Sequence, residues 1–347
     1  MFYRKDDCME DEVKNADRIV VIDLLYLGDL IFATPFIKNL RDKYPEARID
    51  FVANANFVSI IEDNPYLDNV YGYNKKWSIL ESWNFARSLS GNNYDLGLNI
   101  HGNWRTALLM KVIGPDYSVG FGDKGRGLFL DQELPRLDEA HMVEVYRQFL
   151  RDLGFLELPE SELELKVKES AADNVEELLA SYNLNPKQNI IALNTGGSWQ
   201  TKRWPKEKFA ALADKLIKKE AGEVIFTGGP SDIERVDEIR ELMGEDVVSL
   251  AGETTLEELT ALADKIDVMV SGDSGPVHVT AAVGTPTITL FGPSNEKKYH
   301  PYGEEHQIIT HDIECRPCGE HECPLEHHDC LEKVKVNKVF NAITKNR

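Results

Sequence analysis

The chain of 347 residues is long enough for two domains, at about 150 residues per domain. Hydrophobic residues make up 42% and charged residues 28%, which excludes both intrinsic disorder and a protein built mainly of membrane-spanning segments. The 39 Lys and Arg against 59 Asp and Glu leave a net charge of −20, which excludes nucleic-acid binding as a general function and requires a locally basic site for any anionic ligand.

The N-terminal residues 1–15 are polar and mixed in charge, without the apolar segment of a signal peptide. The most apolar stretch, 19–32, is interrupted by Asp23 and Asp29 and is shorter than the ~20 residues that span a bilayer. We therefore expect a cytoplasmic protein without a transmembrane helix.

Short β-branched runs alternate with helix-period segments along the whole chain, which is typical of parallel sheets covered by helices. In the first half, apolar residues recur at helical spacing within 30–40 and 83–89. The strands expected there are 18–23, 48–53, 69–73, 95–100 and 118–120.

An acidic stretch, 157–177, carries no strong strand signal, ends in a helical segment at 171–182, and separates the first series from a second. The second series comprises expected strands at 190–194, 223–227, 247–250, 268–271 and 287–291, and expected helices at 206–218, 231–242, 256–263 and 276–283. Five βα units in each half predict an α/β protein with two doubly wound, Rossmann-like domains.

We place the N-terminal domain at 1–165, a linker at 166–186 and the C-terminal domain at 187–330. The remaining residues, 331–347, are expected to form a C-terminal helix, centred on 337–344.

In open parallel sheets, ligands bind at the carboxyl ends of the strands. The first such loop contains Gly28, which permits a tight turn, and Asp29, which begins a helix whose dipole favours the ionised carboxylate. Asp29 is therefore either a helix-capping residue or a candidate catalytic base.

A second loop combines Thr195, Gly196 and Gly197 with Lys202 and an adjacent arginine before a helix-initiating proline. Small residues followed by cations form a plausible phosphate cradle. Residues 200–219 hold seven Lys or Arg and two Asp or Glu, a local charge of +5, although part of it is equally explained as the solvated face of a helix.

Three further strand ends carry loops of small residues. Gly229 lies in a Gly-Gly-Pro turn, which by itself is a weak signal, and 291–294 could line a sugar pocket or merely turn the chain. The segment 271–278 is more informative, because small residues leave backbone amides open at a helix start. Its candidate ligand-binding residues are Asp273, Ser274, Gly275 and His278.

Four of the five cysteines cluster near the C-terminus, whereas Cys8 stands alone. Cys315, Cys318, Cys323 and Cys330 have spacings that would let four thiolates surround one structural zinc ion. Four reduced, partly buried thiols are the alternative, and an iron–sulfur cluster is a further one.

Taken together, these motifs resemble the ADP-heptose:lipopolysaccharide heptosyltransferases (glycosyltransferase family 9), and most of all the heptosyltransferase II branch. The resemblance rests on the early Leu-Gly-Asp with Thr34-Pro35, on 101–105 (His-Gly-Asn-Trp-Arg), on 202–205 (Lys-Arg-Trp-Pro), on 273–278 and on the cysteine-rich tail. It implies a GT-B fold whose two domains face a cleft. The chain departs from the family at Asp23, Leu25 and Tyr26, so we expect an altered acceptor side of the first loop.

The resemblance implies inverting transfer of a heptose-type sugar from an ADP-sugar, on the C-terminal domain, to a glycan or glycolipid acceptor on the N-terminal domain, without a catalytic metal or other cofactor. Asp29 is the expected base, with an ordinary pKa near 3.9, and Lys202 the expected cation for the leaving diphosphate. Acceptor-binding residues are expected to be Gly28, His101, Asn103 and Arg105. A glycolipid acceptor also implies peripheral contact with the cytoplasmic face of the membrane. Two alternatives are a nucleotide-sugar 2-epimerase and a non-catalytic sugar-nucleotide binding protein.

Overall fold

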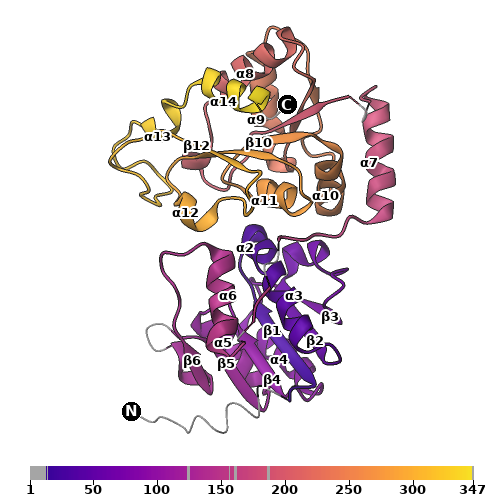
Figure 1. Cartoon of the computed structure of the whole chain (residues 1–347), viewed down its shortest axis with the longest axis vertical. Helices are drawn as coiled ribbons and strands as arrows, with labels where there is room; N and C mark the ends of the chain where they lie inside the picture. Colours follow the sequence, from indigo (N-terminus) through magenta and orange to yellow (C-terminus); the bar gives the residue numbers. More distant parts are fainter. Residues whose placement is uncertain are drawn as a thin grey trace. The chain divides into compact units, whose positions relative to one another are not determined.

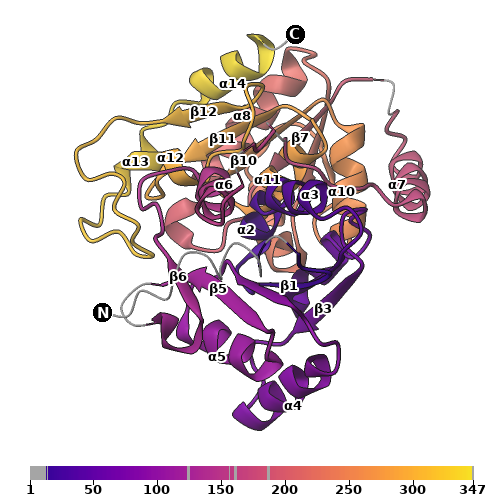
Figure 2. The same ribbon diagram turned by 60° about the horizontal axis from the view of Figure 1, so that its bottom comes forward.

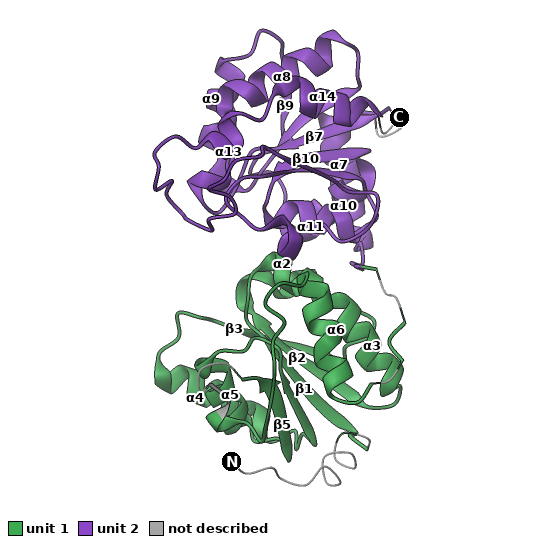
Figure 3. Ribbon diagram, turned by 60° about the vertical axis from the view of Figure 1, so that its left-hand side comes forward, with its two compact units in different colours: residues 1–162 green, residues 163–347 purple. Residues whose placement is uncertain are grey.

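The computed structural model describes residues 13, 15–122, 126–155, 157–159, 162–185 and 188–345, so Cys8 lies outside the described residues. The chain forms two compact units, residues 1–162 and 163–347, each built around its own sheet (Figure 3). No helix among the described residues is long and apolar enough to cross a membrane.

The first unit contains one parallel six-stranded sheet in the order β3-β2-β1-β4-β5-β6. Its strands are β1 (Arg18–Asp23), β2 (Arg48–Asn54), β3 (Asn69–Tyr73), β4 (Leu96–Asn99), β5 (Tyr117–Phe121) and β6 (Gln132–Leu134). All five strands expected from the sequence are confirmed to within two residues at each end. The sixth, β6, was not expected, because three residues with one apolar side chain give no strand signal.

Helices cover both faces of this sheet (Figure 1). They are α2 (Leu27–Phe32), α3 (Thr34–Lys43), α4 (Ile79–Ser90), α5 (Trp104–Ile113) and α6 (Met142–Asp152), with short 3₁₀ turns η1 (Ala55–Ile60) and η2 (Arg126–Phe129). On one face, α4 and α5 pack against Val20 and Ile22 of β1. Elsewhere in the unit, Phe36 of α3 makes edge-to-face contacts with Tyr146 and Phe149 of α6. Val20 and Ile22, two residues apart on β1, thus point to the same face of the sheet.

The second unit repeats this architecture, with a parallel sheet in the order β12-β11-β10-β7-β8-β9. The strands are β7 (Ile190–Asn194), β8 (Glu223–Thr227), β9 (Val248–Ser249), β10 (Val268–Gly272), β11 (Thr287–Phe291) and β12 (Gln307–Thr310). The longer helices are α7 (Glu169–Ser181), α8 (Lys206–Lys218), α9 (Ile233–Glu241), α10 (Leu256–Lys265), α11 (Gly275–Ala282) and α14 (Val336–Lys345). The short ones are η3 (Gln200–Lys202), η4 (Pro230–Asp232), α12 (Glu296–Tyr299) and α13 (Asp329–Glu332).

The helix that we expected inside the linker is α7, and it belongs to the second unit. It packs against α10, where Lys265 pairs with Glu176 at 2.9 Å and Lys168 pairs with Glu257 at 3.6 Å. The two units divide between residues 162 and 163, ahead of the expected linker at 166–186.

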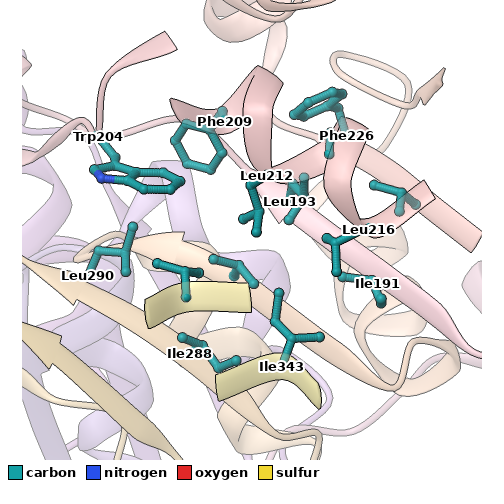
Figure 4. Close-up of a cluster of buried hydrophobic side chains, with 14 of the residues drawn as sticks. Ile191, Leu193, Trp204, Phe209, Leu212, Leu216, Phe226, Ile288, Leu290 and Ile343 are labelled. Atoms are coloured by element: carbon teal, nitrogen blue, oxygen red, sulfur yellow. The ribbon is translucent and has the colours of Figure 1, made fainter. Parts of the chain in front are cut away.

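The C-terminal helix α14 closes one face of the second sheet (Figure 4). Ile343 joins the core cluster that contains Trp204, Leu290 and residues of α8. Trp204 is 1% exposed and donates from its indole N–H to the carbonyl of Val334 at 3.3 Å. Trp204, which follows Lys202 in the basic loop, is thus a core residue that fixes this loop to the C-terminal segment.

Candidate functional site

Asp29 lies in the first turn of α2, directly beyond β1. One carboxylate oxygen accepts the backbone N–H of Tyr26 at 3.3 Å, so the helix-capping role weighed from the sequence is present. Burial, and secondly the charge of Asp23, raise the pKa of Asp29 to about 7. These two effects outweigh the hydrogen bond from the Tyr26 amide and the charge of Arg136, which lower it. The ordinary pKa near 3.9 expected from the sequence is therefore wrong, because burial and a like charge act together here.

Asp23, at the end of β1, is held by several donors. Its carboxylate accepts the Tyr146 hydroxyl at 3.0 Å and the Leu25 amide at 2.9 Å. Nδ1 of His101 lies 3.4 Å from the same carboxylate and accepts the Leu24 amide at 3.1 Å. Because Nδ1 accepts this hydrogen bond, the ring proton of a neutral His101 imidazole is on Nε2.

The remaining candidate acceptor residues follow β4, which pairs with β1 through Ile22 and Asn99. Because neighbouring parallel strands end at the same edge, the loop containing His101 and the loop containing Asp29 lie side by side. Asn103 accepts the Thr106 amide at 2.9 Å, so its side-chain oxygen caps α5. Gly28 lies in α2 beside Asp29.

Two cations border this group. Arg105 donates from Nη1 to the carbonyl of Lys75 at 3.2 Å, and Nζ of Lys75 lies 4.7 Å from the centre of the Tyr26 ring. Burial lowers the pKa of Lys75, against the attraction of Asp23 and Asp29. Lys75, Asp23 and Tyr146 were missed as site residues. Of these, only Asp23 carried a sequence signal, as a charged residue ending a buried strand.

In the second unit, Lys202 and Asp273 form a largely buried ion pair, with Nζ of Lys202 2.6 Å from the carboxylate. Burial opposes ionisation of Asp273, but the hydrogen bond from His278 and the Lys202 charge prevail and lower its pKa to about 2. Nζ of Lys202 also lies 4.3 Å from the centre of the Trp199 ring, a cation–π contact. The expected Lys202, Asp273 and His278 are thus brought together.

Small residues let the two loops of this group approach each other. A Cβ on Gly272 would lie 2.5 Å from the carbonyl oxygen of Lys202, so only glycine fits there. Ser274 begins α11 without capping it, since its hydroxyl lies 2.9 Å from that of Ser271. The first amides of α11, including that of Gly275, therefore stay available to an anion.

The two glycine loops that follow β7 and β8 differ from a simple phosphate cradle. The buried hydroxyl of Thr195 has no hydrogen-bond partner among the described residues. The carboxylate of Asp232 accepts the Gly229 amide at 3.0 Å, and its oxygen would lie 2.7 Å from a Cβ on Gly196. A carboxylate at this point suits hydroxyl groups rather than phosphate. Gly197 contributes its carbonyl oxygen, which accepts Nε of Arg203 at 3.0 Å.

The four C-terminal cysteines line one pocket together with His327 and His328. Hydrogen bonds from backbone amides, that of His328 foremost, lower the pKa of Cys323, whereas burial raises that of Cys330 to about 11. Across the described ranges, no three His, Cys, Asp or Glu side chains are already gathered around one point as metal ligands.

This cysteine segment contacts the Lys202 loop. The hydroxyl of Thr201 donates to the carbonyl of Glu320 at 2.9 Å, and Nε2 of His328 lies 2.7 Å from the carbonyl of Thr201. The ring of Trp199 stacks on His321 with centroids 3.8 Å apart. The cysteine segment therefore holds residues of the loop that carries Lys202.

The chain matches a known protein family and is similar to curated proteins. Residues 82–328 match glycosyltransferase family 9 (heptosyltransferase). The chain is similar to lipopolysaccharide heptosyltransferase 3 of Escherichia coli K12, with 29% identity over 80% of this chain and 83% of the relative.

Two solved structures show the same fold. The family 9 glycosyltransferase of Veillonella parvula matches with a TM-score of 0.88 and 28% identity, covering 95% of this chain and 97% of that one. ADP-heptose lipopolysaccharide heptosyltransferase II of E. coli matches with a TM-score of 0.78 and 24% identity, covering 95% and 98%. The expected α/β class and GT-B fold are confirmed. The chain is a glycosyltransferase and belongs to glycosyltransferase family 9, the heptosyltransferases.

Proposed function

We propose that the protein transfers a heptose-type sugar from an ADP-sugar to an acceptor of the lipopolysaccharide-core type, with inversion and without a catalytic metal. The observation that carries this proposal is Asp29, a carboxyl group whose pKa of about 7 suits a general base near neutral pH. The names of the relatives support the substrates, since they are lipopolysaccharide heptosyltransferases and one is an ADP-heptose enzyme.

Inversion is inferred from which of the two carboxyl groups is open to an acceptor. Asp23 is occupied by the Tyr146 hydroxyl and the Leu25 amide, whereas Asp29 accepts backbone amides, those of Tyr26 and of its own residue. One available base fits a single direct displacement, because retention through a covalent intermediate would need a second group as nucleophile.

In this reaction an acceptor hydroxyl oxygen bonds to the anomeric carbon while the bond from that carbon to the diphosphate oxygen breaks. Asp29 takes the hydroxyl proton, and ADP leaves with the bonding electron pair. Lys202 and the open amides at the start of α11 stabilise the charge that grows on the diphosphate. These groups supply the positive charge that a metal ion provides in other transferases.

Donor recognition divides between two kinds of group. Phosphate oxygens suit Lys202, the Thr195 hydroxyl and the amides near Ser274 and Gly275, while the Asp232 carboxylate beside Gly196 and Gly229 suits sugar hydroxyls. On the acceptor side, Nε2–H of His101 and the Arg105 guanidinium are suited to hydroxyl and phosphate groups.

We also propose a structural zinc ion at Cys315, Cys318, Cys323 and Cys330. Four thiolates are a preferred zinc donor set, and these four side chains line one pocket. The ion would order the segment that holds Thr201 and Trp199 beside Lys202.

Asp29→Asn should lower kcat by about 100-fold or more, because the amide cannot accept the proton. ADP affinity should stay unchanged, and the thermal midpoint at pH 8 should rise, because the variant no longer holds a partly buried charge beside Asp23. A variant with normal turnover and a lower midpoint would show that Asp29 only caps the helix.

The assays compare ADP release with and without acceptor. Release or isomerisation of donor without acceptor would instead indicate the epimerase alternative, and binding without turnover a non-catalytic protein.

The pH profile tests the origin of the raised pKa. Since Asp29 must be deprotonated to act, kcat/KM should rise with pH through about 7 and then level off. Asp23→Asn removes a like charge, so the rise should move to lower pH. A profile that stays flat from about pH 5 to about pH 8, the range in which most proteins are stable, would contradict the assignment.

Lys202→Met should weaken ADP binding by about 10- to 100-fold, because it removes a charge-assisted contact of about 1.5–3 kcal/mol. It also leaves Asp273 buried without its cation, so the double variant Lys202→Met/Asp273→Asn should recover thermal stability but not affinity. Lys218→Met, at an exposed lysine, is the matched control. Equal affinities of wild type and Lys202→Met for ADP, measured by calorimetry, would contradict the proposal that Lys202 binds the diphosphate.

Protein purified without chelator should contain about one zinc ion per chain, and Cys315→Ser/Cys318→Ser should lose it and bind ADP more weakly. Cys8→Ser, outside the cluster, should keep both properties. Less than about one zinc per five chains, with four thiols titrating freely after unfolding, would contradict the zinc site.

A further inference from the structure

Helices α4 and α5 of the first unit carry large apolar side chains on their outer side. Ile79, Leu80 and Trp83 of α4 are 89%, 68% and 50% exposed, and Trp104 and Leu108 of α5 are 59% and 37% exposed. The two helices pack side by side (Figure 2). We call these five residues the α4–α5 surface.

The α4–α5 surface is not needed for the core of the unit. The inner side of the two helices already packs against the sheet through other residues, namely Ala86, Leu89, Leu109, Met110 and Ile113. The outer side of a surface helix is ordinarily polar, and contiguous exposed apolar patches mark interaction sites. Ile79, Trp83, Trp104 and Leu108 also line a common groove, which indicates a continuous patch.

Charge around this patch is opposite to that of the whole protein. Residues 75–113 contain five Lys or Arg and two Asp or Glu, a local charge of +3 in a chain of −20. Asp95 bonds to the amides of Asp17 and Arg18, at the start of β1. Exposed cations beside exposed tryptophans are the combination with which proteins dock on anionic lipid surfaces.

We propose that the α4–α5 surface docks the protein on an anionic lipid bilayer, with Trp83 and Trp104 in the interfacial layer. The patch reaches the candidate acceptor site through Arg105, which lines the groove and bonds to Lys75 beside Tyr26. This inference rests on the proposed function. Docking through the α4–α5 surface places a lipid-anchored acceptor with its sugar toward Asp29. A second copy of the chain is a poorer occupant, because a two-fold contact would bring two basic rims together.

The test is co-sedimentation with vesicles of phosphatidylethanolamine and phosphatidylglycerol, and with vesicles of phosphatidylcholine alone. Wild type should bind the anionic vesicles, more weakly at high salt, and bind phosphatidylcholine poorly. Ile79→Glu/Leu80→Glu should reduce vesicle binding by about tenfold or more, and it leaves the fold intact because acidic residues are favoured in the first turn of a helix. The control is Leu242→Glu, at a leucine of the second unit that is 52% exposed.

A second variant, Lys76→Gln/Lys111→Gln, should bind anionic vesicles less tightly and lose part of the salt dependence. Unchanged vesicle binding by Ile79→Glu/Leu80→Glu, or no binding by wild type, would overturn the proposal. It would equally be overturned if light scattering showed a dimer that this variant abolishes. Transfer to a delipidated acceptor should be the same in this variant and in wild type. If wild type binds vesicles but transfers no sugar, the proposed function fails while the docking surface stands.

Discussion

Two carboxyl groups, Asp23 and Asp29, lie on either side of the loop that follows β1, and the surrounding residues are arranged around this pair. Asp23 receives a hydroxyl, a backbone amide and a nearby imidazole, whereas Asp29 receives the amides of Tyr26 and of its own residue. Burial and the like charge of Asp23 raise the pKa of Asp29 to about 7. The groups that hold Asp23 in place therefore also set the environment of Asp29.

In the second unit, the corresponding group is a buried cation with a carboxylate partner. Asp273 holds Lys202 at 2.6 Å, and Trp199 covers the ammonium group from another side. A buried ion pair adds little net stability, but it avoids a lone buried charge. Asp273 also lies 3.9 Å from Nε2 of His278, so its carboxylate has a second polar neighbour besides Lys202.

The central strands and the loops after their carboxyl ends were predictable, because β-branched runs identify buried strands and parallel topology brings their carboxyl ends to one edge. Edge strand β12 was not, since its apolar run is only the two residues Ile308 and Ile309. The contributions of Tyr146 and Lys75 depend on how α6 and the β3–α4 connection pack, and no local pattern encodes that. The pKa of Asp29 likewise depends on burial and on a neighbouring charge, which spacing alone does not reveal.

Each unit has a basic region beside its candidate site, although the protein as a whole is acidic. Residues 200–219 carry +5 beside the ion pair of the second unit, and residues 75–113 carry +3 beside the carboxyl pair of the first. A strongly negative surface repels anions, so locally basic regions of this kind are where an anionic ligand is favoured. The cation that limits the pKa rise of Asp29 is Arg136, which lies outside the basic region 75–113. Asp23 and Asp29 in turn oppose the lowering of the Lys75 pKa by burial, so this lysine and the carboxyl pair influence each other electrostatically.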